Sequence, residues 1–127
     1  MNLLKDLQAE YNVAYMLIAH DLATVRYMCT WVAVMYLGQI VELSPVKELF
    51  TNPSHPYTKA LMSAALPSHP DMEQEEIILT GEVPSPLDPP SGCYFHPRCP
   101  AVMDRCSVDK PVTKEISEGH TLSCHLF

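Results

Sequence analysis

Proline divides this sequence into two unequal kinds of chain. Of its 127 residues twelve are prolines, and none precedes Pro45 while eleven lie from Pro53 onward. Proline fixes φ and removes a backbone donor, so it interrupts helices and sheet ladders alike. We therefore predict a regular part over residues 1–50 and a less regular extension over residues 51–127. The apolar fraction of 47% is enough for a core.

The first twenty residues predict a helix followed by a buried strand. Apolar residues recur at helical spacing between polar ones, at Leu3, Leu4, Leu7 and Tyr11. Residues 13–19 then form a near-continuous apolar run, too short for a helix and too apolar for a half-exposed strand. Such a run predicts a strand of the parallel type, buried on both faces.

Cap and turn signals predict the next elements. Asp21 is well placed to cap a helix that runs through residues 25–29. The pair Leu37-Gly38 separates two apolar runs, residues 31–36 and 39–43, which predicts a tight hairpin. The order helix, buried strand, helix and hairpin in residues 1–50 is typical of an α/β fold.

The extension predicts a small, irregular α+β structure. Short helices are expected at residues 45–50 and 56–66, with Pro56 suited to a first helical position. Short strands are expected at residues 77–83 and 121–126.

Charge and hydropathy exclude several partners. The net charge is −7 and no basic stripe is present, which argues against nucleic acid and anionic membrane surfaces. The longest uncharged run, about residues 27–41, is too short to span a bilayer, so no direct membrane insertion is expected. The start of the sequence is charged too early for a signal peptide. We predict a cytosolic chain without stable disulfides.

Four cysteines form the strongest candidate site: Cys93, Cys99, Cys106 and Cys124. Their spacing, C-x5-C-x6-C-x17-C, differs from the paired C-x2-C of most structural zinc sites. Four thiolates suit either zinc or an iron–sulfur cluster, and free thiols without a metal are the remaining alternative. Nearby histidines are candidate ligands of a mixed site, although each is more often a residue that orients a loop; they are His96, His120 and His125.

His20 closes the predicted buried strand. Polar side chains at the carboxyl ends of such strands face the crevice where ligands bind. A histidine there can donate a hydrogen bond to a phosphate oxygen or to a water molecule. The alternative is a structural histidine with satisfied hydrogen bonds.

Several longer motifs carry a family resemblance. The sequences IAHDL (residues 18–22) and VAVMYLGQIVE (32–42) resemble the switch-histidine region and following hairpin of ABC-transporter ATPases. The later motifs are similar to the C-terminal extension of oligopeptide and dipeptide transporter ATPase subunits; they are HPYTKAL (55–61), GEVPSPL (81–87) and PSGCYFHPRCP (90–100).

The resemblance implies a fold and a function. Residues 1–50 would be the end of the nucleotide-binding domain, and His20 the switch residue that senses the terminal phosphate of ATP bound with magnesium. The four cysteines would hold a [4Fe-4S] cluster. The implied partners are a second ATP-binding subunit and transmembrane permease subunits, and the implied location is the cytoplasmic face of the plasma membrane.

Other motifs of the family are missing. The four glycines do not form a phosphate-binding loop, because none precedes a lysine, and no Gly-Gly pair or apolar strand ending in Asp-Glu is present. Phosphoryl transfer depends on such positioning groups, so this chain alone is expected not to hydrolyse ATP. We expect it to follow the catalytic motifs of a longer subunit and to expose apolar surface.

Two features keep other functions open. Thr30-Trp31 stands where the family usually carries Asp-Arg, which puts the contacts of that helix end in question. The cysteines alone also fit a stand-alone iron–sulfur or zinc module. A third alternative is an interaction domain that regulates paired ATPase subunits without chemistry of its own.

Overall fold

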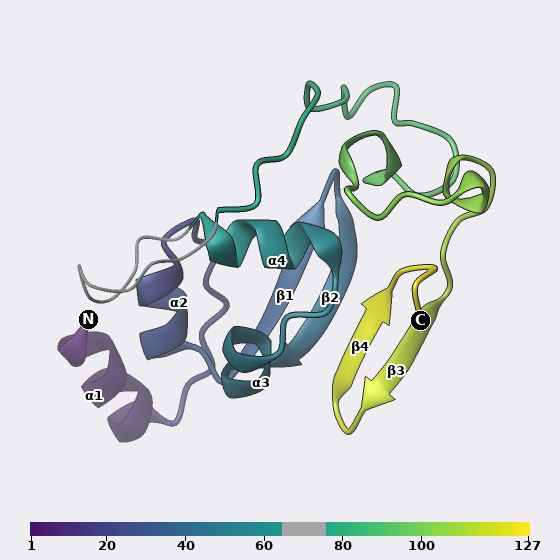
Figure 1. Ribbon diagram of the computed structural model, residues 1–127. Coiled ribbons are helices and arrows are strands. Elements are labelled where there is room, and N and C mark those ends of the chain that lie inside the picture. The colour runs from purple at the N-terminus through teal and green to yellow at the C-terminus, as the bar shows by residue number, and fades with distance from the viewer. Residues whose placement is uncertain (65–75) are drawn as a thin grey trace.

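The fold combines helices with one small sheet (Figure 1). The computed structural model describes residues 1–64 and 76–127. The helices are α1 (Asn2–Tyr11), α2 (Leu22–Met28), α3 (Val46–Thr51) and α4 (Pro56–Ser63), with the short 3-10 helices η1 (His96–Arg98) and η2 (Asp104–Ser107). The strands are β1 (Trp31–Tyr36), β2 (Gln39–Pro45), β3 (Thr113–Ser117) and β4 (His120–Ser123). All neighbouring strands are antiparallel, in the order β1-β2-β4-β3.

The hairpin β1–β2 confirms the prediction from its turn. Leu37 and Gly38 both have positive φ, 45° and 77°. Two consecutive positive φ values define the type I′ turn, whose twist matches that of paired strands. Gly38 meets this requirement without steric cost, and the two flanking apolar runs then pair directly.

Helices α1 and α2 also form where the sequence predicts them. Asp21 caps α2 by accepting hydrogen bonds from the N–H groups of Ala23 and Thr24, at 3.1 Å and 3.2 Å. Polar contacts join α1 to α2, because the Tyr27 hydroxyl donates to Asn2 Oδ1 at 2.7 Å. No residue of α1 is buried, and Leu3, Leu4 and Tyr11 of its apolar stripe are exposed.

The prediction of a buried strand over residues 13–19 is wrong for this structure. These residues have no regular structure, and their side chains are exposed, with Met16 92% and Ile18 91% accessible. A buried parallel strand needs neighbours on both edges and layers on both faces. No strand of the described chain lies beside this run, so its backbone stays outside the sheet.

The extension differs from the prediction in its strands. The expected helices are present as α3 and α4, although residues 65 and 66 of the second lie outside the described part. Residues 77–83 form no strand, which corrects that prediction. The expected strand at 121–126 is shifted to β4, and β3 was not predicted. Both outcomes depend on pairing partners: β4 pairs with β2, which is distant in sequence.

The core lies between the β1–β2 hairpin and the segments that fold over it. Its buried members are Val34, Tyr36, Val41, Leu49 and Phe95. Helices α3 and α4 lie against one face of the hairpin (Figure 1). Phe95 comes from the cysteine-rich segment, so that segment belongs to the same core as the hairpin. Across residues 1–64 and 76–127, no helix is long and apolar enough to cross a membrane.

Candidate metal centre and the buried polar cluster beside it

Three of the four cysteines lie in a segment that folds back on itself. The Cys93 N–H donates to the carbonyl oxygen of Cys106 at 2.8 Å. Gly92 allows this approach, because its φ is +65° and a Cβ there would lie 2.4 Å from the same carbonyl oxygen. The chain thus brings Cys93 and Cys106 together through their backbones, and Cys99 follows η1 in the same segment.

Backbone N–H groups point toward the thiols and oppose the effect of burial. Burial raises the pKa of Cys93, and the N–H groups of Phe95 and His96 partly offset this by favouring the thiolate. Burial likewise raises the pKa of Cys99 and Cys124, with opposing N–H groups from Ala101 for Cys99 and from Leu126 and His125 for Cys124. The net pKa of each of these three thiols is raised, so a metal must displace protons to bind them.

The four thiols lie in one neighbourhood, although they come from two distant stretches of chain. After burial, the main cause that raises the pKa of Cys99 is the charge of the other three cysteines, and Cys124 is affected by Cys106 and by Glu42. All are free thiols. Within the described ranges, no three His, Cys, Asp or Glu side chains are arranged to hold a metal ion. Four thiols are the donor set of a four-thiolate zinc or iron–sulfur site.

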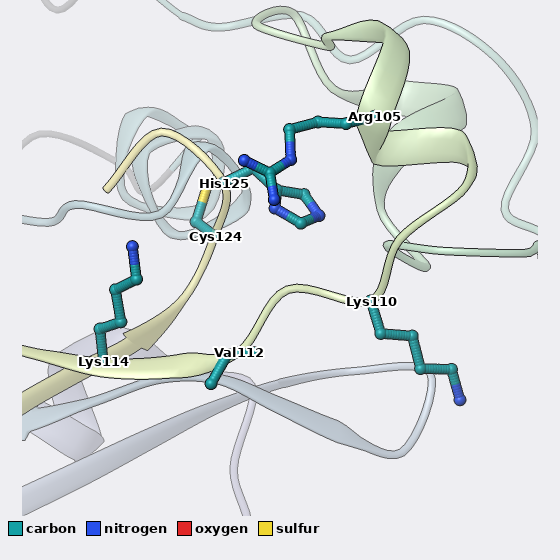
Figure 2. A pocket seen from close by; sticks show the side chains of 6 residues that line it. All are labelled: Arg105, Lys110, Val112, Lys114, Cys124 and His125. Carbon is teal, nitrogen blue, oxygen red and sulfur yellow. The ribbon is translucent and has the colours of Figure 1, made fainter.

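A small cavity of about 90 Å³ lies beside Cys124 (Figure 2). The side chains that line it with Cys124 are mostly basic: Arg105, Lys110, Val112, Lys114 and His125. Two of them are engaged by backbone oxygens, because Lys114 donates to Phe127 and His125 donates from Nε2 to Asp109 at 2.9 Å. This cavity therefore lies at the edge of the cysteine segment, and two of its basic side chains already have hydrogen-bond partners.

Glu42 lies at the centre of a buried polar cluster next to these cysteines. Its carboxylate is 0% exposed and accepts from the N–H groups of Ser54 and His55, at 2.8 Å and 3.0 Å. It also accepts from His120 Nε2 at 2.7 Å. His120 Nδ1 lies 4.0 Å from Glu48 on α3. A buried carboxylate is tolerated when donors satisfy it in this way, so Glu42 joins β2, the start of α4 and β4.

His55 is the second buried histidine of this cluster. Its Nδ1 accepts a hydrogen bond from the Tyr57 N–H at 3.1 Å and so caps α4. Its Nε2 is buried, with no hydrogen-bond partner among the atoms of the described chain. Burial lowers the pKa of His55 to about 4, against the opposing charge of Glu42. His55 is therefore neutral at physiological pH.

The remaining predicted site residues are not brought together. His20 is exposed just before α2. His96 bonds the Cys93 carbonyl oxygen at 2.9 Å through Nδ1, which orients the cysteine segment. Sequence reasoning did not select Glu42, because a lone glutamate in a strand is usually a solvated residue. Its partner His120 is 78 positions away.

The chain is similar in sequence to named ATP-binding proteins over almost its whole length. A probable peptide ABC transporter ATP-binding protein of Sinorhizobium fredii is 52% identical over 126 residues, which is 99% of this chain and 36% of the relative. The oligopeptide transport ATP-binding protein AppF of Bacillus subtilis is 44% identical over 129 residues, covering 100% of this chain and 39% of AppF. This chain thus spans between 36% and 39% of the length of these relatives.

The structure combines the β1–β2 hairpin, helices α3 and α4 on one of its faces (Figure 1), and a folded-back cysteine segment that contributes Phe95 to the core. The family described as oligopeptide/dipeptide transporter, C-terminal region, matches residues 41–106. The chain belongs to this family. The matched range runs from β2 to Cys106 and so includes Glu42, His55 and three of the four cysteines.

Proposed function

We propose that this chain acts as the C-terminal part of the ATP-binding subunit of a peptide-importing ABC transporter. The observation that carries the proposal is similarity over 98% to 100% of the chain to proteins named as peptide or oligopeptide ATP-binding proteins. In the complete subunit, ATP binding and hydrolysis would drive peptide uptake. The partners would be a second ATP-binding subunit and permease subunits, with the protein held at the cytoplasmic face of the membrane.

The uncovered apolar run supports this proposal. Residues 13–19 have the composition of a buried strand, yet they are exposed here, as are Leu3, Leu4 and Tyr11 of α1. A contiguous apolar patch marks a surface that another part covers. The remainder of the subunit would supply the neighbouring strands and place His20 at the edge of the completed sheet, where it would contact the terminal phosphate of ATP.

The test replaces the matching part of the Bacillus subtilis relative with this chain. The chimera is expected to bind and hydrolyse ATP, whereas the isolated chain should do neither. His20→Ala in the chimera should preserve ATP binding and lower the rate of hydrolysis by about a hundredfold or more, as expected for loss of a proton-transfer or phosphate-sensing group. Lys47→Ala, at an exposed position, is the control. Normal hydrolysis by the His20 variant would overturn the role of this residue.

We also propose that Cys93, Cys99, Cys106 and Cys124 hold a metal centre, with an iron–sulfur cluster as the first alternative and zinc as the second. The opposing N–H groups at three of the thiols support this, because hydrogen bonds to sulfur stabilise thiolate ligands. When bound, the metal would link the cysteine segment to the end of β4.

Anaerobic purification followed by assays for iron, acid-labile sulfide and zinc tests the metal proposal. Serine in place of each of the four cysteines should lower the metal content, while Cys29→Ser should leave it unchanged. Cys29 is the matched control because it is the C-cap of α2, outside the cysteine segment. An anaerobic preparation free of iron, sulfide and zinc would exclude a resident metal.

A further inference from the structure

The fourth cysteine is held differently from the other three. Cys93, Cys99 and Cys106 share one segment whose two ends are joined by the Cys93–Cys106 backbone hydrogen bond. Cys124 instead follows β4, which ends at Ser123. The position of Cys124 therefore depends on how the β3–β4 hairpin is attached to the rest of the sheet.

Few backbone pairs attach the β3–β4 hairpin to β2. The strands β1 and β2 pair at six positions, whereas β2 and β4 pair at two, Glu42 with Leu122 and Leu43 with Thr121. Figure 1 shows the β3–β4 hairpin beside β2 at the margin of the molecule. A two-position ladder contributes little on its own. Side-chain contacts must supply most of the stabilisation.

Leu122 of β4, which pairs with Glu42, is buried at this junction and contributes apolar packing. Two further side-chain contacts in the described chain join the hairpin to β1 and β2. The first is the buried pair of Glu42 and His120, at 2.7 Å, which joins β2 to the first residue of β4. The second is the Trp31 ring, which covers Gly119 in the β3–β4 turn so closely that a Cβ there would lie 2.6 Å from it. Of the two contacts, Glu42 and His120 are fully buried, whereas Trp31 is 52% exposed. A buried polar group that loses its hydrogen-bond partner is left unsatisfied, which is costly.

We infer that Glu42 is a positioning residue: its buried pair with His120 holds the β3–β4 hairpin on β2 and thereby keeps Cys124 beside the other three cysteines. The inference concerns the same cysteines as the proposed metal centre, but it requires no bound metal. Glu42 serves this purpose because its other hydrogen bonds, to the N–H groups of Ser54 and His55, fix the carboxylate.

Thiol crosslinking tests this inference in the metal-free chain. The short bifunctional reagent dibromobimane is applied in a Cys29→Ser background, and the crosslinked peptides are mapped by mass spectrometry. Glu42→Ala and His120→Gln should lower the yield of crosslinks that include Cys124 by more than about tenfold, because loss of a buried partner shifts docking strongly. Crosslinks between Cys93 and Cys106 should remain.

The sole tryptophan gives a second readout that does not depend on the cysteines. Undocking of the hairpin would free Trp31 from Gly119, so its emission should shift to the red in both variants. Glu48→Gln is the matched control, because Glu48 is 41% exposed and lies 4.0 Å from His120. Circular dichroism shows whether Glu42→Ala folds. If it does not, His120→Gln alone tests the inference, because it leaves the Glu42 carboxylate with the N–H donors of Ser54 and His55.

The inference is wrong if a folded variant crosslinks Cys124 at the wild-type yield, or if the wild-type chain gives no Cys124 crosslinks. A cobalt(II) titration of the wild-type chain separates the two proposals, because thiolate-bound cobalt has a distinct absorption spectrum. Absence of cobalt binding, together with an anaerobic preparation free of iron and sulfide, would remove the metal proposal. Loss of the Cys124 crosslinks in the folded Glu42 and His120 variants would still support the positioning role of Glu42.

Discussion

The beginning of the chain and the sheet reverse the usual relation between polarity and burial. In residues 1–20 nearly all apolar side chains are exposed, and α1 buries none of its residues. In the sheet and its covering helices, fully buried side chains include several polar or ionisable ones: Glu42, Ser44, His55, Thr58 and His120. The apolar run has no neighbouring strand in the described part of the chain, whereas the polar cluster finds its partners there.

This contrast shows that the composition of a segment predicts its burial only when the groups it pairs with are also known. A strand-like run such as residues 13–19 stays exposed when no neighbouring strand is present. Burying its unpaired backbone N–H and C=O groups would cost free energy. Conversely, a glutamate can be buried in a small sheet when three donors meet its carboxylate. The stability of the described fold should therefore reside almost entirely in the second region.

Truncating one aliphatic side chain in each region tests this comparison most directly. Leu49 is 0% exposed in the core and Ile18 is 91% exposed. Leu49→Ala should lower the free energy of unfolding by about 2–5 kcal/mol through lost burial and a cavity. Ile18→Ala should change it by less than about 0.5 kcal/mol. Urea unfolding measures both, and equal losses would show that residues 13–19 are packed in solution.

Acidification should destabilise the polar region through His55. Its pKa is about 4 in the folded chain and near 6.5 when exposed, so the unfolded state binds the proton more readily. This contribution to stability is complete above pH 6.5 and is lost as the pH falls through 4, by about 3 kcal/mol in total. Unfolding of His55→Asn, which keeps an acceptor for the Tyr57 N–H, should show a flatter pH profile. Parallel profiles would mean that His55 is not buried as a neutral base.

Local chemistry made half of this fold predictable. The Leu37-Gly38 turn and the Asp21 cap act within a few residues, and both the hairpin and α2 form where the sequence places them. Strand β3 was missed because its sequence, TKEIS, is polar and mostly exposed. It becomes a strand only by pairing with β4 across the Glu118-Gly119 turn.

The four cysteines of the candidate metal site could be predicted from the sequence, but the buried residues beside them could not. The number of cysteines alone indicates a site, and the structure brings their thiols into one neighbourhood. The importance of Glu42 and His120 arises from a contact between positions 78 residues apart. No local pattern encodes such a contact, and only the docking of β4 on β2 reveals it.

The turn between β3 and β4 offers a smaller test, in which two glycines are compared. Gly38 and Gly119 both have positive φ, 77° and 69°, so alanine at either position costs about 1–2 kcal/mol of backbone strain. A Cβ at Gly38 meets nothing within 4 Å, whereas one at Gly119 collides with Trp31. Gly119→Ala should therefore be the more destabilising change and should alter tryptophan emission. An unchanged spectrum would place Trp31 away from the turn.

The smallest effect is expected at the border of the two regions, where Asp21 caps α2. Hydrogen bonds from the Thr24 hydroxyl and the Ala23 N–H lower the pKa of Asp21 below 3.8. The cap is therefore complete above that pH and is lost as the pH falls through the lower folded value. Asp21→Ala should speed amide exchange at Ala23 and Thr24 without moving the urea midpoint, since only Val25 of α2 is buried. A shifted midpoint would mean that α2 transmits the loss to the sheet, and the two regions would then unfold as one.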